Sequence, residues 1–287
     1  GLCRLDLLRG IGLIQIPTTL LAMVDAAVGG KTGINFGGLK NEVGAFANAR
    51  YVIVNTCFLD TLDTANLCSG YAEMLKHSLI SNAQMWAEHV NFDILQPDLA
   101  ELQRMVAASI AVKEHIVADD PHEHGIRKAL NFGHTIGHAL EEFSMQQPGG
   151  AVVSTAPTKQ EIPKGGAVIS ARLLQLARAR TAPKNTLLHG YAVAFGLIGE
   201  LYISARKAGF PTARLHQTAR FIRENYGAVA FTCDDYPTLL NLMRHDKKNT
   251  SDTINFTLLH DIGDIRINQT ATDEEIREAL DFIREGY

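Results

Sequence analysis

The sequence lacks the features that mark several large classes of protein. Its four cysteines show no CxxC spacing, which excludes a disulfide framework and indicates reduced thiols. No apolar run reaches the length of a membrane span, and no charged-then-apolar leader is present. The net charge of −4, with no basic stripe interleaved with aromatic residues, argues against a nucleic-acid partner. These absences predict a soluble cytoplasmic enzyme.

The residues that are present are ordinary for a globular protein, with 46% hydrophobic and 20% charged. A chain of 287 residues suffices for one large domain or two modest ones with a buried core. The N-terminal residues have the character of the end of an α/β sheet domain, and the pattern becomes helical from about Cys68. Residues 144–186, rich in Gly, Pro, Thr and Ala, are expected to leave the core as an excursion with one added helix at 168–180.

The segment NFGHTIGHALEEF, residues 131–143, carries two histidines, His134 and His138, four residues apart. No proline follows until Pro148, and good helix formers occupy 139–142, so we expect a helix. Positions i and i+4 lie on one face of a helix, so both imidazoles point the same way. Two histidines in this geometry share a metal, or divide the work between a metal and proton transfer. The alternative is two histidines packed on an apolar stripe.

Near the N-terminus, the apolar stretch 13–16 predicts a short strand that Pro17 ends. Two threonines, Asp25 and the tetrapeptide Gly-Gly-Lys-Thr at 29–32 follow. Small residues and a lysine after a strand suit a phosphate or nucleotide, which backbone N–H groups must approach closely. The motif is weak, because it lacks the upstream glycine of a Walker loop, and a tight turn is the alternative.

The other elements are predicted from periodicity and turn residues. They comprise a glycine-bounded loop holding Lys40 and Asn41, a buried strand at 51–56, helices at 70–80, 98–118, 187–210, 212–225 and 272–287, and a β-hairpin at 254–267.

Three predicted helices contribute one carboxylate and two imidazoles, from Glu73, His134 and His189. These are the ligands of a catalytic zinc with an open position for water or substrate, although Glu73 could instead form an exposed salt bridge three residues from Lys76. Cations accompany the set: Lys31, Lys76, Lys113, Arg127 and one or both of Lys247 and Lys248. So many cations imply a substrate with several negative charges, most simply a phosphate and a carboxylate.

Five segments resemble, in the same order, the signature segments of 3-dehydroquinate synthases. They are IPTTLLAMVDAAVGGKTGIN (16–35), GYAEMLKHSLI (70–80), GIRKALNFGHTIGHALE (125–141), LLHGYAVAFGL (187–197) and HDKKN (245–249). The resemblance implies a partial Rossmann-like α/β part at 1–66, followed by a mostly α-helical metal-binding domain at 67–287 with an insertion at about 144–186.

The resemblance also implies an activity. Members of the family convert 3-deoxy-D-arabino-heptulosonate 7-phosphate to 3-dehydroquinate and phosphate in the shikimate pathway of aromatic amino acid biosynthesis. Such an enzyme is a phosphate-eliminating carbon–oxygen lyase (EC 4.2.3.4) that uses NAD and one divalent metal, zinc or cobalt, commonly as a homodimer. Its chemistry combines transient oxidation by NAD, elimination of phosphate, return of the hydride and aldol closure.

Carried over position by position, the resemblance assigns roles to individual residues. The metal ligands would be Glu73, His134 and His189, and the proton-transfer residues His138 and Glu123. The residues that would act on or hold substrate are polar or charged: Arg9 from a partner subunit, Asp25, Lys31, Asn41, Lys76, Lys113, Arg127, Asn131, Lys247 and Lys248. The residues that would contact NAD are Thr18, Thr19, Lys40 and the turn from Phe58 to Thr61.

Two departures from the family pattern bear on activity. The glycine-rich phosphate turn and the acidic ribose-binding residue of the nucleotide domain are not in this sequence, which implies a truncated NAD site. The excursion at 144–186 separates His189 from the HxxxH segment; loop-closure entropy grows only logarithmically, so we expect His189 still to reach Glu73 and His134. The alternatives are another sugar-phosphate cyclase, a metal-dependent polyol dehydrogenase, and an inactive metal-binding fragment of a synthase.

Overall fold

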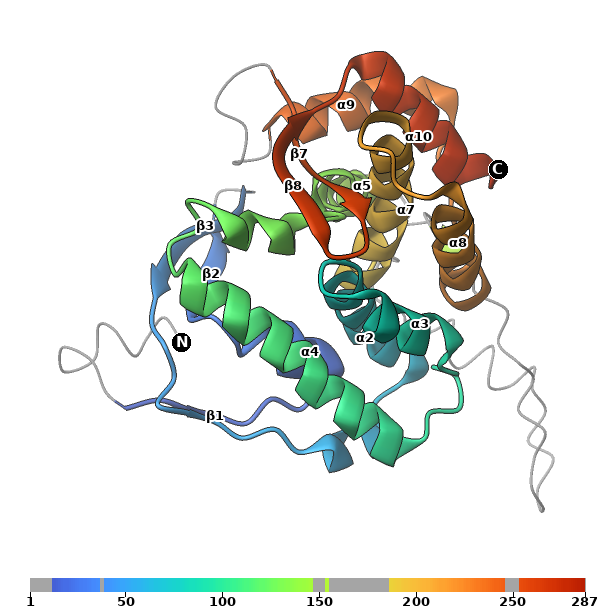
Figure 1. Cartoon of the computed structure of the whole chain (residues 1–287). Helices are drawn as coiled ribbons and strands as arrows, with labels where there is room; N and C mark the ends of the chain where they lie inside the picture. Colours follow the sequence, from blue (N-terminus) through green and yellow to red (C-terminus); the bar gives the residue numbers. More distant parts are fainter. Residues whose placement is uncertain (1–11, 37–38, 147–152, 155–185, 246–252, 287) are drawn as a thin grey trace, which may run out of the picture.

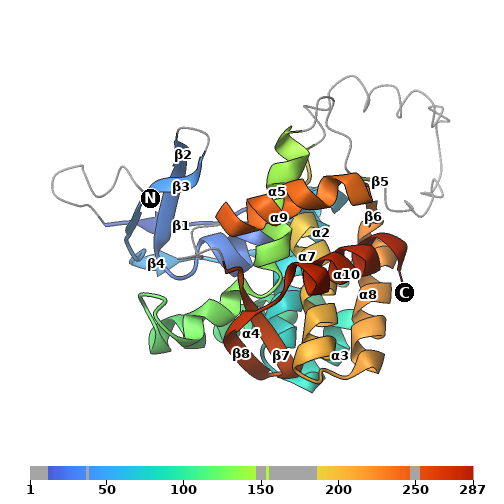
Figure 2. The same ribbon diagram turned by 90° about the horizontal axis from the view of Figure 1, so that it is seen from above.

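The structure of the chain is a computed structural model that describes residues 12–36, 39–146, 153–154, 186–245 and 253–286 (Figure 1, Figure 2). Short elements precede the first long helix. In chain order they are β1 (Ile14–Gln15), a π-helical turn (Ala22–Ala26), β2 (Lys31–Phe36), β3 (Leu39–Phe46), β4 (Tyr51–Val52) and a 3₁₀ helix (Thr56–Thr61). The strand expected at 13–16 is confirmed as β1.

β1 and β4 pair in parallel, with Ile14 opposite Tyr51 and Gln15 opposite Val52. Parallel pairing requires a crossover connection, and here residues 16–50 supply it. The pair forms a small sheet on one side of the molecule, away from the long helices α7 and α8 (Figure 2). The N-terminal part therefore has the parallel pairing that a Rossmann-like fold requires.

The expectation of a buried strand at 51–56 is wrong in both length and burial. The strand is limited to Tyr51–Val52, and Tyr51 and Ile53 are 56% and 50% exposed. A strand in a parallel sheet is buried when helices cover both faces. In the described part of the chain β4 pairs with β1 alone. β-branched residues indicated the strand, whereas its burial depends on the layers packed against it.

Lys40 and Asn41 lie in strand β3, so the expectation of a glycine-bounded loop is wrong at these positions. β2 and β3 form an antiparallel hairpin in which Gly33 pairs with Gly44. Glycine lowers local strand propensity, which is why the sequence favoured a loop. Hydrogen bonding between the two strands overrides that local preference.

The rest of the described chain is mainly helical. Its elements are α2 (Thr64–Leu79), α3 (Ala83–Asn91), α4 (Leu99–Asp119), a 3₁₀ helix (Ile126–Asn131), α5 (His134–Gln146), β5 (Val153–Ser154), α7 (His189–Lys207), α8 (Thr212–Tyr226), β6 (Ala228–Val229), a 3₁₀ turn (Cys233–Asp235), α9 (Tyr236–His245), β7 (Asn255–Asp261), β8 (Asp264–Thr270) and α10 (Asp273–Glu285).

The helices expected at 70–80, 98–118, 187–210, 212–225 and 272–287, and the hairpin at 254–267, are confirmed within a few residues at most ends. Side-chain caps explain several starts: Asp98 accepts from two backbone N–H groups of α4, and Thr272 forms a capping box with Glu275 on α10. Helices α3 and α9 were not anticipated. The helix expected at 168–180 lies outside the described residues.

Helix α5 begins at His134, three residues later than expected, because residues 126–131 form a separate 3₁₀ helix. Gly133 between them has φ +80°, a left-handed conformation that L side chains rarely adopt. An added Cβ at Gly196 of α7 would lie 1.9 Å from the carbonyl oxygen of Gly133. Glycine at these two positions therefore lets α5 and α7 pack closely.

Helix α7 lies at the centre of the helical part, against α2, α5, α8, α10 and strand β7 (Figure 1). Its residues are buried on nearly all sides, as expected for a helix that is apolar all round. The N-terminal part joins this body through the π-helical turn, which packs on α2 and α4 and buries Met23 and Val24. That packing places Asp25 beside the helices that carry Glu73 and Lys113.

The expected domain boundary at 66/67 falls in the first turn of α2 and stays a prediction. The expected insertion at 144–186 lies mostly outside the described residues. Within the described ranges, no helix is both long enough and apolar enough to span a membrane.

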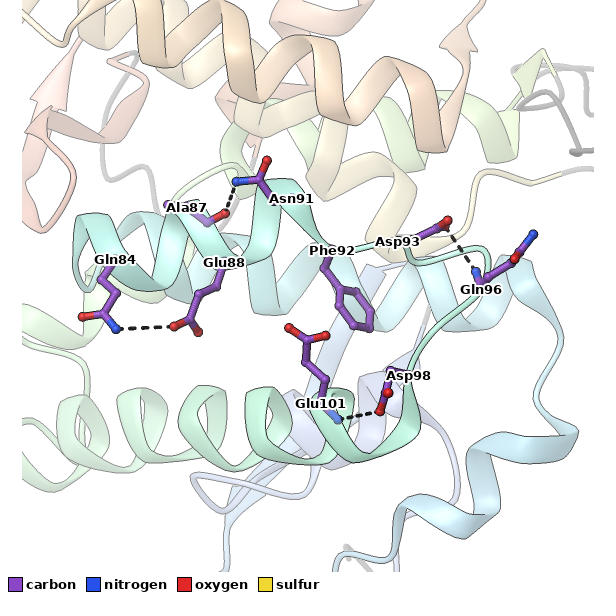
Figure 3. A pocket seen from close by; sticks show the side chains of 9 residues that line it. All are labelled: Gln84, Ala87, Glu88, Asn91, Phe92, Asp93, Gln96, Asp98 and Glu101. Atoms are coloured by element: carbon purple, nitrogen blue, oxygen red, sulfur yellow. Dashed lines mark hydrogen bonds between the residues drawn. The ribbon is translucent and has the colours of Figure 1, made fainter.

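A cavity of about 480 Å³ opens between α3 and the start of α4 (Figure 3). Its lining is mostly carboxylates and carboxamides: Gln84, Ala87, Glu88, Asn91, Phe92, Asp93, Gln96, Asp98 and Glu101. Asp98 is the helix cap and Glu88 pairs with Arg104, so part of this acidic character is structural. None of the residues expected in the functional site lines it.

Candidate metal and anion site

Three side chains from three helices converge at the buried centre of the site. Glu73 lies in the middle of α2, while His134 and His189 are the first residues of α5 and α7. The Nε2 atoms of the two histidines lie 3.4 and 3.3 Å from the same oxygen, Oε1 of Glu73. The long separation in sequence therefore does not prevent His189 from lying beside Glu73 and His134.

The two distances from Oε1 of Glu73 to the imidazole nitrogens match the ligand separation of a tetrahedral metal ion, and all three donor atoms lie within 4.8 Å of one another. Ligand bonds of about 2.1 Å at tetrahedral angles place ligand atoms about 3.4 Å apart. Oε1 of Glu73 is buried and has no hydrogen-bond partner among the described residues. A buried carboxylate oxygen without a donor is costly unless a cation binds it. The donor set therefore fits a divalent metal such as zinc.

Glu73 and His134 have the protonation states that a metal needs. Burial raises the pKa of the Glu73 carboxyl, but Lys76 and His134 outweigh that effect and hold the pKa well below its usual value. Burial, reinforced by Lys76, lowers the pKa of His134 to about 3. An ionised carboxylate and a neutral imidazole are both competent ligands at neutral pH.

His189 is different, because a second carboxylate contacts it. Burial lowers the pKa of His189, but its hydrogen bond with Glu141 and the nearby Glu73 raise the pKa to about 9. Without a metal, the His189 ring is therefore protonated on both nitrogens, and positively charged, at neutral pH. A bound cation would displace that proton, since metal binding requires the neutral ring.

His138, one turn along α5 from His134, is half-buried beside both candidate ligands. Its ring centroid lies 5.2 Å from that of His134 and 5.9 Å from that of His189. Donor atoms of His138, Glu141 and His189 all lie within 4.8 Å of one another. The i, i+4 spacing thus produces the shared face that the sequence indicated.

Two buried lysines lie next to carboxylates. Lys76 pairs with Glu73, and both side chains are almost completely buried. Lys113 of α4 donates to the side chain of Asp25 at 2.5 Å and to its backbone carbonyl at 2.6 Å. Burial lowers the pKa of Lys113, and Asp25 partly restores it. Lys76 thus contacts Glu73 directly, whereas Lys113 is held by Asp25 and interacts with Glu73 electrostatically.

Glu123 forms a second cluster in the loop before the 3₁₀ helix. It pairs with Lys31, and its Oε1 accepts from Nδ2 of Asn131 at 2.7 Å. Its φ of 62° is left-handed, which is uncommon outside glycine and asparagine. Such strain persists only where the surroundings impose it, and it concentrates at functional sites.

Arg127 is buried and donates to two backbone carbonyls, those of Pro121 and Gly29, the latter at 3.0 Å. It joins the turn that leads into Lys31 to the loop that carries Glu123. In this structure its guanidinium hydrogen bonds therefore position two loops.

Residues expected to contact NAD lie at the carboxyl end of the small parallel sheet. Thr18 is exposed and Thr19 half-buried, and Phe58 and Thr61 lie exposed in the 3₁₀ helix after β4. Ligands of α/β sheets bind at this end of the strands. Lys40 and Asn41 lie in β3, whereas Arg9, Lys247 and Lys248 lie outside the described residues.

Sequence reasoning missed two residues that support the candidate ligands. Glu141 accepts a hydrogen bond from Nδ1 of His189 at 3.0 Å. The sequence does place Glu141 on the same helical face as the two histidines, because it lies seven residues after His134 and three after His138. Glu200 accepts from the backbone N–H groups of Gly133 and Thr135 at 2.8 and 2.9 Å. No local pattern marks Glu200, since its partners are more than sixty residues away.

Comparison with known protein families gives two matches that together cover most of the chain. A family model described as "3-dehydroquinate synthase C-terminal" matches residues 70–156 and 179–249. A second, described as "3-dehydroquinate synthase N-terminal", matches residues 3–69. The unmatched stretch between the two parts of the first match is 157–178.

Among similar proteins, a 3-dehydroquinate synthase from Parabacteroides distasonis is 49% identical over 97% of this chain and 69% of its own length. One from Clostridium tetani is 29% identical over 96% of this chain and 63% of its own length. The chain thus spans about two thirds of the length of these relatives. The expected enzyme class, a carbon–oxygen lyase of this type, is confirmed at the level of the family.

Solved structures share the fold. A 2-epi-5-epi-valiolone synthase from Streptomyces hygroscopicus with NAD⁺ and Zn²⁺ bound has a TM-score of 0.74 and 22% identity, covering 100% of this chain and 70% of its own. A 2-deoxy-scyllo-inosose synthase with carbaglucose-6-phosphate, NAD⁺ and Co²⁺ has a TM-score of 0.71 and 22% identity, covering 99% and 69%. These matches confirm the expected fold class.

Proposed function

Because the chain belongs to the 3-dehydroquinate synthase family, we propose that it carries the catalytic metal and substrate site of that enzyme. The reaction is the conversion of 3-deoxy-D-arabino-heptulosonate 7-phosphate to 3-dehydroquinate and phosphate, in the shikimate pathway. The observation that carries the proposal is the buried Oε1 of Glu73, which lies 3.3–3.4 Å from two imidazole nitrogens, while the other oxygen of the same carboxylate pairs with the buried Lys76.

Glu73, His134 and His189 would hold one divalent metal, zinc or cobalt. A metal in this position polarises a substrate hydroxyl and lowers its pKa. The three ligands leave a position open for substrate, as in catalytic zinc sites. The neighbouring lysines, Lys76 and Lys113, would hold the anionic groups of the substrate in one pose, which contributes through positioning and electrostatics.

Proton transfer is assigned to two residues. His138 is half-buried next to both ligand imidazoles, where it can reach a bound substrate group. Glu123 is held by Lys31 and Asn131, and its left-handed backbone supports a functional constraint on its direction.

Asp25 would hold Lys113 in place, and the family pattern also assigns Asp25 a role in binding substrate. The roles of Arg9, Asn41, Arg127, Lys247 and Lys248 in holding substrate are proposed on the family pattern alone.

NAD is the proposed second cofactor, and it would accept and return the hydride. The described residues offer a rim for it at the carboxyl ends of β1 and β4, with the hydroxyls of Thr18, Thr19 and Thr61 and the exposed ring of Phe58. Lys40 is included on the family pattern. This rim fits one edge of a dinucleotide, and the described residues contain no glycine-rich phosphate turn.

A phosphate-release assay tests the proposal. The purified chain is incubated with heptulosonate 7-phosphate, NAD and zinc, with an EDTA-treated sample and Glu142→Gln, an exposed neighbour on α5, as controls. We expect chelator-sensitive phosphate release without accumulation of NADH, abolished in Glu73→Gln and unchanged in Glu142→Gln.

Other outcomes identify the alternatives. NADH accumulation without phosphate release would indicate a polyol dehydrogenase, and release from another sugar phosphate in a substrate panel would indicate a sister cyclase. A folded sample that binds zinc but releases no phosphate would indicate a synthase fragment without turnover.

We further propose that the protein acts in the cytoplasm as a homodimer. The few cysteines without pairing motifs support the first point, and the family pattern at Arg9 supports the second. Light scattering of the purified chain measures the oligomeric state, and a monomer at micromolar concentration would contradict the dimer.

A further inference from the structure

The backbone around His189 is fixed from two sides where α7 begins. The N–H of Leu187 donates to Oγ of Ser144 on α5 at 3.0 Å. The N–H of Gly190 donates to Oγ of Ser69 on α2 at 3.1 Å. Both serines are buried, so neither bond competes with water. His189, which lies between these two anchors, therefore has a defined Cα position.

Close packing reinforces the second anchor. A Cβ added at Gly190 would lie 1.8 Å from the carbonyl oxygen of Ser69, so only glycine permits this approach of α7 to α2. These contacts locate the start of α7, but they leave the rotation of the His189 ring open. The direction of Nε2 must be set by a partner of the ring itself.

Glu141 is that partner. Its Oε2 lies 3.0 Å from Nδ1 of His189, a hydrogen-bond distance, while Nε2 of the same ring lies 3.3 Å from Oε1 of Glu73. An ionised carboxylate can only accept, so Nδ1 must carry a hydrogen. In the neutral ring, Nε2 then has its lone pair free and directed at Glu73.

We infer that Glu141 is a positioning residue for the metal site, because it fixes both the tautomer and the orientation of His189. The inference rests on the proposed function, since it assumes that Glu73, His134 and His189 bind a metal. A carboxylate on the far nitrogen of a ligand histidine also makes the ring more basic and strengthens its bond to the metal.

A competing role is that Glu141 ligates a second ion with His138 and His189, whose donor atoms lie within 4.8 Å of it. The distances favour positioning, because 3.0 Å between Nδ1 and Oε2 is shorter than the separation of about 3.4 Å between ligands of one tetrahedral ion. The number of ions bound per chain distinguishes the two roles.

The test is a titration of the metal-free chain with Zn²⁺ and with Co²⁺, for the wild type, Glu141→Gln and Glu142→Gln. Glu142 is the matched control, since it is adjacent on α5 but exposed. We expect one ion per chain, an affinity about 10- to 100-fold weaker in Glu141→Gln, and an altered visible spectrum of its Co²⁺ form. Glu142→Gln should equal the wild type in all three.

A double-mutant cycle separates positioning from a general loss of structure. If Glu141 acts through His189, Glu141→Gln should have no further effect on affinity in a His189→Ala background. Thermal unfolding of the metal-free proteins checks folding. Should Glu141→Gln fail to fold, Glu141→Asp replaces it, because the shorter carboxylate keeps the charge but reaches Nδ1 poorly.

Each outcome bears on one claim. Equal affinities of Glu141→Gln and Glu142→Gln would overturn the inference while leaving the metal site intact. Two ions in the wild type and one in Glu141→Gln would also overturn it, in favour of a second ion. Wild-type binding that Glu73→Gln does not weaken would instead overturn the proposed function itself.

Discussion

At the scale of single residues, the buried pair of Glu73 and Lys76 combines a candidate metal ligand with its counter-charge. Each side chain is at most 1% exposed, and the lysine keeps the carboxylate ionised at the centre of the protein. Removing one partner of a buried pair leaves the other charge uncompensated, whereas replacing both often restores stability. Binding and stability can therefore be separated at this position.

We expect Glu73→Gln to abolish stoichiometric metal binding and to lower the free energy of unfolding by about 3 kcal/mol, because Lys76 loses its counter-charge. The double variant Glu73→Gln/Lys76→Met should recover most of that stability but no metal binding. Urea unfolding of the metal-free proteins measures the first quantity and Zn²⁺ titration the second. Equal stability of the wild type and Glu73→Gln would contradict the structural role of the pair.

His89 predicts a pH dependence of stability remote from the candidate ligands. Burial lowers its pKa to about 4, so the unfolded chain, with an ordinary pKa near 6.5, binds the proton first as the pH falls. The contribution of neutral His89 to the free energy of unfolding is therefore fully present above pH 6.5. It is lost between about pH 6.5 and 4, and the loss amounts to about 3 kcal/mol in total.

Urea unfolding at several pH values measures this decline. His89→Gln should remove that part of the slope, because glutamine does not titrate. The exposed His124→Gln is the control and should keep the wild-type slope. Parallel pH profiles for the wild type and His89→Gln would contradict the assignment.

At the scale of elements, a carboxylate on one helix caps the start of another. Glu200 of α7 is fully buried and accepts backbone N–H bonds from Gly133, Thr135 and Ile136, at 2.8, 2.9 and 3.3 Å. Negative charge at a helix N-terminus complements the helix dipole and satisfies donors that lack intrahelical partners. Since His134 is the first residue of α5, this cap also fixes a candidate metal ligand.

We expect Glu200→Gln to lower the free energy of unfolding by about 2 kcal/mol, since hydrogen bonds to a charged acceptor contribute about 1.5–3 kcal/mol. Metal affinity should fall as well, because α5 loses the anchor beside His134. The exposed Glu278→Gln on α10 is the control for both measurements. A loss of stability with unchanged metal affinity would show that the cap does not position the ligand.

At the scale of the whole molecule, the site is assembled from α2, α4, α5, α7 and the N-terminal turn, and the hydrogen bonds that fix the start of α7 come from α2 and α5. We therefore expect that replacing 157–178, the stretch that the family model leaves unmatched, with a Gly/Ser sequence of equal length keeps Zn²⁺ affinity within about twofold. The wild type and the replacement are compared by Zn²⁺ titration. A large loss of affinity with an intact fold would assign that stretch a role in the site.

The sequence by itself determined the features that depend on local spacing. The HxxxH segment placed His134 and His138 on one face, and the apolar periods located α7, α8 and the β7–β8 hairpin, because helix and strand periods are fixed by backbone geometry. The order of five segments identified the family. The residue types also predicted one carboxylate and two imidazoles as a candidate ligand set, and the structure brings these three side chains together.

Only the tertiary structure decided the features that depend on partners distant in sequence. The exposure of β4 follows from which layers cover the sheet, and the strand at Lys40 and Asn41 follows from pairing with β2. Glu141 reaches His189 across 48 residues, and Glu200 reaches the start of α5 across more than sixty. Hydrogen bonds over such separations form only when whole helices pack. Helical spacing can therefore place Glu141 on the face of His134 and His138, but it cannot specify His189 as its partner.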